Sequence, residues 1–348
     1  LTHYKYHDEL EYASEAEKWL QMAATESDKL ITSGRYEIYN TGHPQEDYFN
    51  MYRIDDKSDL KEAVLYVDYK TNIREHNMAA AGREAGCGFS KSFVESFLCS
   101  DGLPISLSNK YLGDETMRKE TANRDPRLKQ LILTNDFPTN VTDDLKDSTF
   151  VVNEDEFITQ HCFTGYRPIK GFNPIYSQAL YMKSSFDGIA YRYAETLLIN
   201  AEAKAELNTI TNADLDRTVN QLRDRVGMPH LTVNVGFTDP KWPDWGYSLS
   251  PVLQEIRRER CIELAGEGFR FNDLKRWKAG KLLNNVLTYV GKRKPDGNLA
   301  IVYPNYTNPD LSYQAGKSRT WEDKMYLYPI PTGELQRNPQ LLPQNPGW

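Results

Sequence analysis

The hydrophobic positions follow a helical period at the start of the chain and again in its second half. Over residues 8–33, apolar side chains recur at steps of three and four, and Gly34 follows as a stop signal. From residue 187, the string GIAYRYAETLLINAEAKAELN carries one apolar stripe whose small alanines allow a neighbouring helix to approach closely. We therefore predict one helix over 8–33 and a second from residue 187. The stripe of the second helix consists of Tyr191, Ala194, Leu197, Leu198, Ala201 and Ala205.

Three more helices are predicted in the following stretch. Asn212 is a favourable N-cap, and apolar residues follow it at a four-three-four spacing until Gly227 ends the pattern. Ser250 precedes Pro251, a combination typical of the first turn of a helix. A further helix is predicted to begin around Phe271. Together with the alanine-rich stripe, these paired antiparallel helices indicate helical hairpins of the tetratricopeptide kind.

The chain between residues 35 and 180 lacks the helical period. The string EAVLYVDY (62–69) alternates as a strand does, SKSFVESFL (90–98) is typical of one short helix, and Gly, Asn, Asp and Pro interrupt the rest. The final string YLYPIPTGELQRNPQLLPQNPGW is rich in Pro and Asn, so we predict that it lies extended over the surface. The predicted fold is mainly α, with tetratricopeptide-like hairpins, long irregular loops and a few short strands. Its segments are 1–36 (helical scaffold element), 37–180 (irregular ligand-binding segment), 181–298 (tetratricopeptide-like helices) and 299–348 (extended C-terminal segment packed on the scaffold).

Charge and hydropathy exclude two classes of partner. The 348 residues carry a formal net charge of −7, whereas a nucleic-acid binder needs a basic face for phosphate. No stretch approaches the ~18 consecutive apolar residues of a transmembrane helix. Aromatic residues make up 12% of the chain and many lie in polar strings, which suits ligand stacking as well as packing. We predict no nucleic-acid partner and no membrane span.

The sequence offers no recognisable metal or cofactor motif. Its four cysteines form no CxxC pair and have no matching histidine spacing, so no zinc site is predicted. The acidic string DDKSD (55–59) lacks the glycine and the final glutamate of an EF-hand loop and is interpreted as a solvated charge run. A bridge between Cys87 and Cys99 stays open. Cys261, inside a helical pattern, is predicted to be a buried free thiol.

The string IRRERCIELAGEGFRFNDLKRW (256–277) concentrates arginines, glutamates and aromatic residues. One interpretation is a carboxylate pair for acid–base chemistry, as in glycoside hydrolysis, which needs two carboxylates facing each other across a substrate. The other interpretation is structural. Glu255, Glu259 and Glu263 follow one helix ridge at four-residue steps, with arginines at offsets that form ion pairs and keep the carboxylates ionised. We favour the structural interpretation, with Leu253, Ile256 and Leu264 facing inward.

Several strings of this chain strongly resemble the SusD/RagB family of Bacteroidetes outer-membrane lipoproteins. The string 256–277 is similar to the C-terminal signature of that family, as are YRYAETLLINAEAKAEL, LDRTVNQLRDRVGMP and the closing YLYPIPTGELQRNPQLLPQNPGW. Earlier in the chain, AEKWLQMAATESDKLITSGRYEI and SFLCSDGLPI…NRDPRL resemble its third helical hairpin and the segment after it. The resemblance covers essentially the whole chain in collinear order. The string RDPR (124–127) is interpreted as a structural Asp-Pro turn braced by arginines, with anion binding as the alternative.

The resemblance implies a tetratricopeptide-like scaffold on which long irregular segments and short strands form a ligand-binding face. Members of the family are not enzymes. They capture glycans, or peptides in some members, and act as a hinged lid over a SusC-like TonB-dependent transporter at the outer membrane. The family normally carries a signal peptide, a lipidated N-terminal cysteine and about half of its helical scaffold ahead of the point where this chain starts. An outward-facing lipoprotein is therefore expected, with its lipid anchor outside this chain as the only contact with the membrane.

Three strings could supply a ligand site, and for the third, VYPNYTNPDLSYQAGKSRTW, packing of the C-terminal segment is the favoured interpretation. A pyranose has one apolar face and a ring of hydroxyls, so a sugar binder needs flat aromatic platforms with polar donors beside them. The string KWPDWGY places two tryptophans on a proline-stiffened loop, and YVDYKTNIREHNMAAAGREAGCGF offers a second aromatic and polar group. For both strings, packing onto the scaffold is the alternative. The predicted ligand-binding residues are Trp242, Trp245, Tyr69, His76, Asn77 and Phe89, with no catalytic residue and no metal ligand.

The function predicted from the sequence is non-catalytic: capture of an oligosaccharide or polysaccharide at the cell surface and its delivery to the transporter barrel. The net negative charge disfavours acidic polysaccharides unless a local basic patch overrides it. A RagB-type homologue that binds peptides in the same lid role is one alternative. Another is a helical-repeat scaffold that binds only other proteins, which predicts that the aromatics of loop 230–249 are buried. An enzyme would need two convergent carboxylates across a cleft, and the sequence promises no such pair.

Overall fold

The chain is rich in helices, and its described residues include three two-stranded antiparallel sheets, β1–β4, β2–β3 and β5–β6. The predicted mainly α fold with a few short strands is confirmed. The computed structural model describes residues 5–7, 12–78, 88–159, 161–301 and 320–348. The helices are α2 (Ala13–Thr32), α3 (Asp47–Asn50), α5 (Lys91–Ser96), α6 (Met117–Thr121), α7 (Arg127–Leu131), α8 (Tyr176–Ala179), α9 (Tyr193–Glu206), α10 (Asn212–Asp216), α11 (Val219–Arg225), α12 (Pro251–Glu263), α13 (Arg270–Arg276) and α14 (Thr332–Arg337). The strands are β1 (Ala63–Val67), β2 (Pro138–Val141), β3 (Ser148–Phe150), β4 (Gly188–Arg192), β5 (Val290–Arg293) and β6 (Leu299–Ile301).

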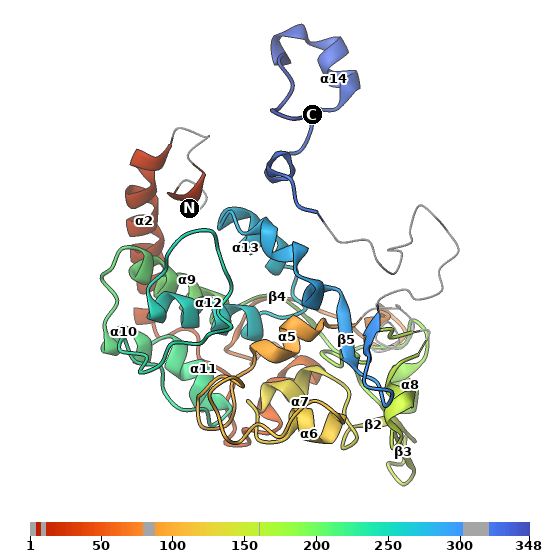
Figure 1. The fold of residues 1–348 in the computed structure, drawn as a ribbon. Helices are drawn as coiled ribbons and strands as arrows, with labels where there is room; N and C mark the ends of the chain where they lie inside the picture. Colours follow the sequence, from red (N-terminus) through yellow and green to blue (C-terminus); the bar gives the residue numbers. More distant parts are fainter. Residues whose placement is uncertain (1–4, 8–11, 79–87, 160, 302–319) are drawn as a thin grey trace.

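Helix α9 lies between α2 and α12 and forms the centre of the scaffold (Figure 1). Leu20 and Ala24 of α2 pack against Ala203 of α9, where small side chains let the two helices approach closely. Asn200 adds a polar link, because its Nδ2 donates to the Ala24 carbonyl at 3.0 Å. The helices predicted over 8–33 and 90–98 are present as α2 and α5, and residues 8–11 lie outside the described part of the chain.

Helix α12 begins as its sequence predicts. Ser250 is the N-cap, its side-chain oxygen accepts the Leu253 N–H, and Pro251 occupies the first turn. The predicted apolar side of this helix is confirmed, since Leu253, Ile256 and Leu264 are all buried. Each belongs to one core cluster that α12 shares with α9 and α11. The apolar ridge of α12 therefore packs against the scaffold, and its charged ridge faces away from this apolar cluster.

The helix predicted from residue 187 starts later, and that prediction is wrong for its first residues. Residues 188–192 form β4, which pairs with β1 so that Tyr191 lies opposite Leu65. Tyr191 is 57% exposed and is no part of the helical stripe. Helix α9 begins at Tyr193. The string GIAYR suits both periods, and the partner strand β1 selects the extended form by pairing its backbone.

The helix predicted after Asn212 is two helices, and its cap is Thr211 rather than Asn212. The Thr211 side chain accepts the Asp214 N–H, while the Asp214 carboxylate accepts the Thr211 N–H, which is a capping box. The chain leaves the helical conformation at Thr218, where φ is −129° and ψ is −96°. The apolar spacing continues across that break, so periodicity alone does not reveal it.

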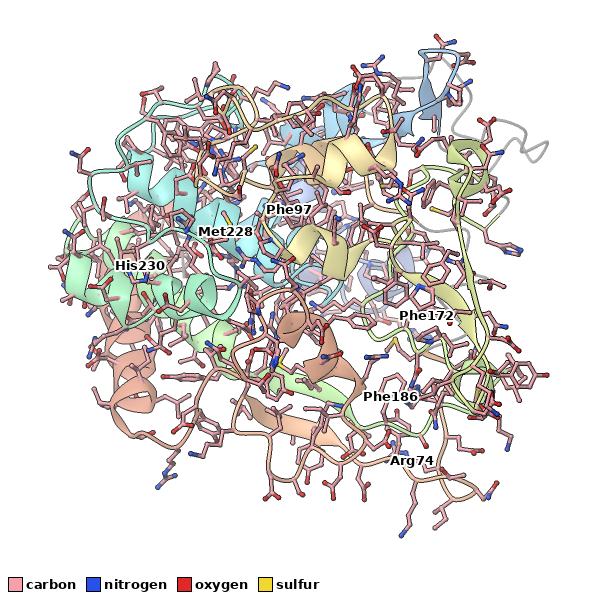
Figure 2. The ribbon with its side chains drawn as sticks, turned by 90° about the horizontal axis from the view of Figure 1, so that it is seen from below. Arg74, Phe97, Phe172, Phe186, Met228 and His230 are labelled. Carbon is pink, nitrogen blue, oxygen red and sulfur yellow. The ribbon has the colours of Figure 1, made fainter. Side chains whose placement is uncertain are left out.

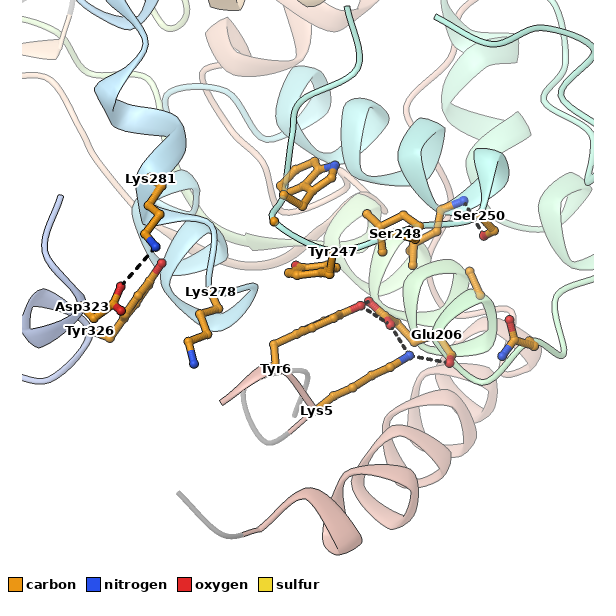
Figure 3. A pocket seen from close by; sticks show the side chains of 16 residues that line it. Lys5, Tyr6, Glu206, Tyr247, Ser248, Ser250, Lys278, Lys281, Asp323 and Tyr326 are labelled. Carbon is orange, nitrogen blue, oxygen red and sulfur yellow. Dashed lines mark hydrogen bonds and ion pairs between the residues drawn. The ribbon is translucent and has the colours of Figure 1, made fainter. Parts of the chain in front are cut away.

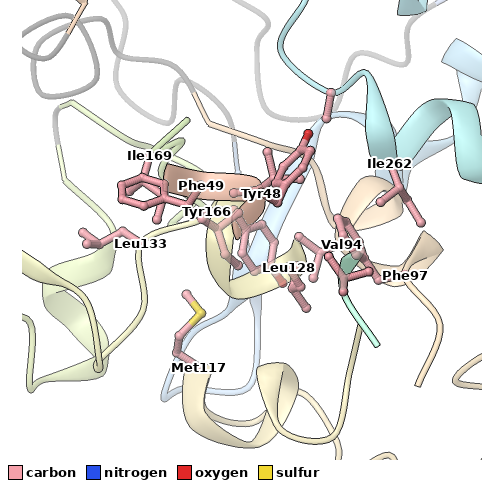
Figure 4. Close-up of a cluster of buried hydrophobic side chains, with 14 of the residues drawn as sticks. Tyr48, Phe49, Val94, Phe97, Met117, Leu128, Leu133, Tyr166, Ile169 and Ile262 are labelled. Carbon is pink, nitrogen blue, oxygen red and sulfur yellow. The ribbon is translucent and has the colours of Figure 1, made fainter. Parts of the chain in front are cut away.

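The largest hydrophobic cluster lies beneath the irregular middle segment and joins it to α12 (Figure 4). Phe97, Leu128 and Ile262 meet there, and none is more than 1% exposed. The middle segment is thus held by its own buried side chains, at roughly 1.5–3 kcal/mol for each large apolar side chain removed from water. Other members of the cluster are Tyr48, Phe49, Val94, Met117, Leu131, Ile132, Tyr166, Ile169 and Phe172.

Two further expectations need correction. Cys261 is a free thiol as predicted, but it is half-buried rather than buried. Cys99 is a buried free thiol, and Cys87 lies outside the described residues.

The C-terminal string is not extended throughout, because residues 332–337 form α14. The N–H groups of Glu334 and Leu335 donate to the Pro331 carbonyl at 2.8 and 3.2 Å and close its first turn.

Candidate functional site

Two irregular segments, residues 69–78 and 176–187, pair along one side of the molecule. We refer to them as the 69–78/176–187 face. The His76 N–H donates to the Ser184 carbonyl at 2.9 Å, and the Ser184 N–H donates to the His76 carbonyl at 3.1 Å. This exchange is the pattern of an antiparallel bridge, so each segment fixes the height and direction of the other. The pairing leads directly into the β1–β4 sheet, which carries both segments on the helical scaffold.

A row of side chains runs inward from this face, from exposed Arg74 to Phe186, which is 3% exposed. The Arg74 guanidinium lies 5.0 Å from the Tyr69 ring centroid, Tyr69 meets His76 edge-on at 4.5 Å, and His76 meets Phe186 edge-on at 4.6 Å. Figure 2 shows Arg74 and Phe186 on one side of the molecule, well away from His230. The structure therefore brings together two residues that the sequence predicts as ligand-binding, Tyr69 and His76. Asn77, a third, belongs to the same segment.

Buried groups behind the row hold its shape. The Asp187 carboxylate accepts the Tyr69 N–H at 2.8 Å and the Lys57 N–H at 3.0 Å, and Asp187 itself is 2% exposed. The Lys57 ammonium lies 5.8 Å from the Phe186 ring centroid and donates to the Ile54 carbonyl. Burial lowers the pKa of Lys57 to about 8, against the opposing effect of nearby carboxylates. These contacts fix the backbone on which Tyr69 sits.

Two hydrogen bonds fix the tautomer of neutral His76. Its Nδ1 accepts the Met78 N–H at 3.1 Å, so the proton resides on Nε2, which donates to the Phe186 carbonyl at 2.8 Å. Burial lowers the pKa of His76, the Phe186 carbonyl opposes that shift, and the charge of Lys57 adds to it. His76 is therefore a structural link between the two segments and no proton donor to a substrate.

We expect the proton NMR titration of His76 to have its midpoint below the ordinary value of about 6.5. The His76→Gln variant assigns the signal, and the same protein in concentrated urea supplies the unfolded reference. Because the pKa is lower in the folded state, the stability contributed by neutral His76 is complete above the unfolded pKa and is lost as the pH falls through the folded pKa. A folded midpoint at or above the urea value would contradict this assignment.

The 69–78/176–187 face also carries exposed side chains that the sequence analysis missed. Tyr176 and Tyr181 are 53% and 70% exposed. Helix α8 holds the first, and the turn after it presents the second. Asn77 ties this turn to the face, because its Oδ1 accepts the Met182 N–H at 3.0 Å. The signal in the sequence is the string YSQALY, two tyrosines in a polar stretch with no helical or strand period.

The two predicted loop tryptophans lie elsewhere and are anchored to α12. Trp242 is half-buried and its Nε1 donates to Glu255 at 2.7 Å. Trp245 is 6% exposed and its Nε1 donates to Gln254 at 2.6 Å, with its ring packed edge-on against Trp277. The structure thus gives Trp245 a packing role and does not join either indole to the Tyr69 group. The protein-binding scaffold alternative predicts buried aromatics in this loop, and Trp245 is buried whereas Trp242 is half-buried.

Phe89 is also placed apart from Tyr69 and His76. Its ring stacks on Phe93 with the centroids 4.4 Å apart, and both rings pack against the largest core cluster. Its backbone N–H donates to the Tyr166 carbonyl at 2.9 Å. Phe89 therefore anchors the middle segment to the core. Ligand binding by Trp242, Trp245 and Phe89 stays a prediction that the geometry does not support.

The carboxylates of α12 face arginines rather than open space. The Glu263 carboxylate accepts from Arg127, Arg192 and Arg225 at 2.9, 2.6 and 2.6 Å. Glu259 accepts from Arg127 on one oxygen and from another buried arginine on the other. Burial alone would raise the pKa of Glu263, but the three arginines hold it well below its usual range. Glu263 is therefore an ionised structural partner and is unsuited to act as a general acid.

The string RDPR has the predicted structural role. The Asp125 carboxylate accepts from the Arg127 Nη2 at 2.7 Å, while the Arg124 Nη2 donates to the Val94 and Phe97 carbonyls at 2.8 and 2.9 Å. All three side chains of the motif are buried, so the arginines brace the turn from inside. No group of three or more potential metal ligands occurs among the described residues.

A cavity of about 670 Å³ lies where the loop before α12 meets the end of α9 (Figure 3). Its floor is Glu206, whose carboxylate accepts from Lys5 at 2.6 Å, from the Tyr6 hydroxyl at 2.7 Å and from Arg257 at 2.9 Å. The Tyr6 ring stacks on Tyr247 at 4.4 Å. The Glu206 carboxylate and the facing rings of Tyr6 and Tyr247 are thus already engaged by the chain itself. We therefore assign it to the scaffold rather than to ligand binding.

Stacked helices that carry an irregular aromatic face define a tetratricopeptide-like scaffold protein. The model of the SusD family matches residues 29–348, and this chain belongs to that family. The resemblance drawn from its sequence strings is thereby confirmed. Among the described residues, no helix has the length and apolar character needed to cross a membrane.

Three relatives illustrate the match. SusD-like protein P2 of Formosa agariphila is 33% identical over 166 residues, which are 48% of this chain and 27% of that protein. A crystal structure of a SusD-like protein from Bacteroides fragilis is 25% identical, with a TM-score of 0.67, and the match covers 96% of this chain and 63% of that one. A SusD-like carbohydrate-binding protein from the same species is 22% identical, with a TM-score of 0.65 and coverage of 94% and 62%. The chain thus spans less than two thirds of the length of each of these relatives.

Proposed function

We propose that this chain binds an oligosaccharide or polysaccharide without catalysis, and that the 69–78/176–187 face is its binding surface. The observation that carries the proposal is the pairing of two distant segments into one row of aromatic and polar side chains on a rigid scaffold. Carbohydrate binding is the property associated with the SusD family. The alternative function, peptide binding, uses the same surface. An experiment distinguishes it from carbohydrate binding.

The chemistry of the face suits a sugar ring. Tyr176 and Tyr181 offer exposed flat apolar surfaces with a polar edge, which matches the one apolar face of a pyranose and its rim of hydroxyls. The paired segment adds the amide of Asn77 and the hydroxyl of Tyr69, which are planar and directional hydrogen-bonding groups. The backbone pairing at Ser184 holds the two segments together before a ligand arrives, which lowers the ordering cost of binding.

Delivery to a SusC-like TonB-dependent transporter is the second part of the proposal. SusD-family proteins are cell-surface lipoproteins of the outer membrane and associate with such transporters. A non-catalytic protein on an open surface needs a partner that moves its cargo across the membrane. Co-purification of the full-length protein with a β-barrel of this type from outer-membrane extract tests this part, and a full-length protein that purifies without any barrel would count against it.

Replacing Tyr181 by alanine should weaken glycan binding about fivefold to tenfold, because the exposed ring supplies stacking surface without supporting the fold. Calorimetric titration of the protein with a panel of soluble polysaccharides identifies the bound class, and the variant is then titrated with that class. Tyr328→Ala is the matched control, since Tyr328 is also 70% exposed but lies in the C-terminal segment.

Two outcomes would overturn the proposal. Equal effects of Tyr181→Ala and Tyr328→Ala would remove the binding surface from this face. Saturable binding of a tryptic protein digest, with no response to any polysaccharide, would move the protein to the peptide-binding branch of the family. Circular dichroism of each variant confirms that the fold is unchanged.

A further inference from the structure

Two cations stand opposite each other at the edge of the 69–78/176–187 face. Lys70 and Arg74 exchange both backbone hydrogen bonds, the Lys70 N–H donating to Arg74 O at 2.8 Å and the Arg74 N–H donating to Lys70 O at 2.9 Å. Asn72, with φ at +62°, makes the turn between them. Residues paired in this way have side chains on the same side of the hairpin with their Cα atoms about 5.5 Å apart. Like charges at such positions destabilise a hairpin.

Neither cation is neutralised by a carboxylate within the described part of the chain. The nearest candidate on the hairpin, Glu75, is engaged by Lys183 at 3.0 Å and by the Asn72 N–H at 3.2 Å. Asp187 is buried and its two oxygens accept backbone N–H groups. Asp68, on the same segment, is exposed and forms no ion pair with Lys70 or Arg74 among the described residues. Two neighbouring like charges without a counter-charge lower the stability of the folded chain. The fold itself does not require this pair.

Arg74, one of the two cations, is also held in place by an aromatic ring. The Arg74 guanidinium lies 5.0 Å from the Tyr69 ring centroid, and Tyr69 is held by the Asp187 carboxylate and the His76 ring. Contact with an aromatic ring restricts the guanidinium and leaves its N–H groups available for a partner. A guanidinium matches the two oxygens of a carboxylate or sulfate in a bidentate manner, whereas the lysine ammonium acts as a point charge beside it.

We propose that Lys70 and Arg74 bind an anionic substituent, a carboxylate or a sulfate, of the glycan that occupies the 69–78/176–187 face. This inference rests on the proposed function and specifies its ligand as an acidic polysaccharide. The overall charge of the chain, −7, opposes such a ligand, but screening limits that effect to about 8 Å at physiological ionic strength. At short range, the charges of Lys70 and Arg74 therefore decide the preference for an anionic group over a neutral one.

The test compares three polymers in calorimetric titrations at physiological ionic strength: polygalacturonate for carboxylate, dextran sulfate for sulfate, and dextran as a neutral reference. We expect one of the two polyanions to bind more tightly than dextran. Replacing both cations, as Lys70→Gln with Arg74→Gln, should weaken that polyanion about fivefold to tenfold and leave dextran unaffected. Asp68→Asn should strengthen it about twofold to threefold, because it removes an exposed carboxylate two residues before Lys70 in the chain.

A matched control separates the pair from general charge. Lys29→Gln removes one exposed cation from α2 and should leave polyanion binding unchanged. If it weakens binding as much as Arg74→Gln alone, the attraction is nonspecific and the anion site is overturned. If the double variant binds both polyanions as the unmodified protein does, while Tyr181→Ala weakens binding, the glycan-binding face stands and the anion site falls. If none of the three polymers binds to the unmodified protein while another polysaccharide of the panel does, the glycan-binding face stands and the anion site falls. If no polysaccharide of the panel binds, the proposed function falls and takes this inference with it.

Discussion

Replacing Glu263 by glutamine is expected to lower the free energy of unfolding by about 3–5 kcal/mol, because it removes a buried counter-charge that three buried arginines share. Glu263 is 0% exposed and accepts from Arg127, Arg192 and Arg225. Glutamine keeps the size of the side chain, so the loss reflects charge and hydrogen bonding rather than a cavity. Urea unfolding followed by far-UV circular dichroism measures the effect.

The size of this loss should depend on pH in a defined direction. The pKa of Glu263 lies well below its usual range in the folded state, so its contribution is present above the ordinary glutamate pKa and is lost as the pH falls through the folded value. The difference between the unmodified protein and Glu263→Gln should therefore be constant from pH 5 to 7, within about 0.5 kcal/mol, and narrow only in stronger acid. Glu15→Gln, which breaks an exposed pair with Lys18, is the control and should cost less than about 0.5 kcal/mol. Equal effects of the two variants would contradict the buried-network assignment.

Replacing Trp277 by alanine is expected to cost about 3–5 kcal/mol of folding stability, the range for a large buried aromatic side chain. Trp277 is 0% exposed, and its Nε1 donates to Glu202 at 2.6 Å. Its ring packs edge-on against Trp245 and lies 4.4 Å from the Arg257 guanidinium. Alanine would remove all of these contacts at once and leave a cavity between α12 and α13.

Graded variants distinguish packing from the hydrogen bond. Trp277→Phe keeps most of the ring volume and should cost less than Trp277→Ala, while Glu202 retains its two bonds from Arg276. Trp348→Ala, at a residue 48% exposed, is the control and should change the melting temperature little. A loss below about 1 kcal/mol for Trp277→Ala would show that the ring is not a structural anchor. In folded variants, the affinity for glycan should be unchanged.

Both residues belong to the charged and aromatic string 256–277, whose role the sequence already indicated. Four-residue spacing placed its glutamates on one ridge, and interleaved arginines favoured ion pairs over acid–base chemistry. The partners themselves were not predictable. Arg127, Arg192 and Arg225 come from three separate parts of the chain, and only the fold brings them to Glu263.

The start of α9 shows where local pattern fails. Residues 188–192 fit a helical stripe as well as an alternating strand, and β1 decides between them by offering backbone partners. The break between α10 and α11 is similar, because apolar side chains remain in register on either side of Thr218 while the backbone does not. In both places the deciding contact comes from a distant residue or from backbone geometry.

The candidate site was predictable only in part. Tyr69, His76 and Asn77 stood out as aromatic and polar residues in a segment without regular period. Tyr181 did not, since nothing local indicates that residues 176–187 pair with residues 69–78. For the loop tryptophans the error was the opposite one, because residues predicted to bind a ligand are held against the scaffold. Proline and glycine indicated an exposed loop, but the indole N–H groups find acceptors on α12 and draw the rings inward.

The sequence by itself determined the helical scaffold, the first turn of α12, the structural role of string 256–277 and the SusD family, because these depend on spacing and local chemistry along the chain. Only the tertiary structure decided which aromatic side chains stay exposed, which carboxylates are neutralised, and that Lys70 and Arg74 are left without a counter-charge among the described residues. Exposure and charge compensation are properties of neighbours in space. Their partners lie many residues away, so no local pattern can specify them.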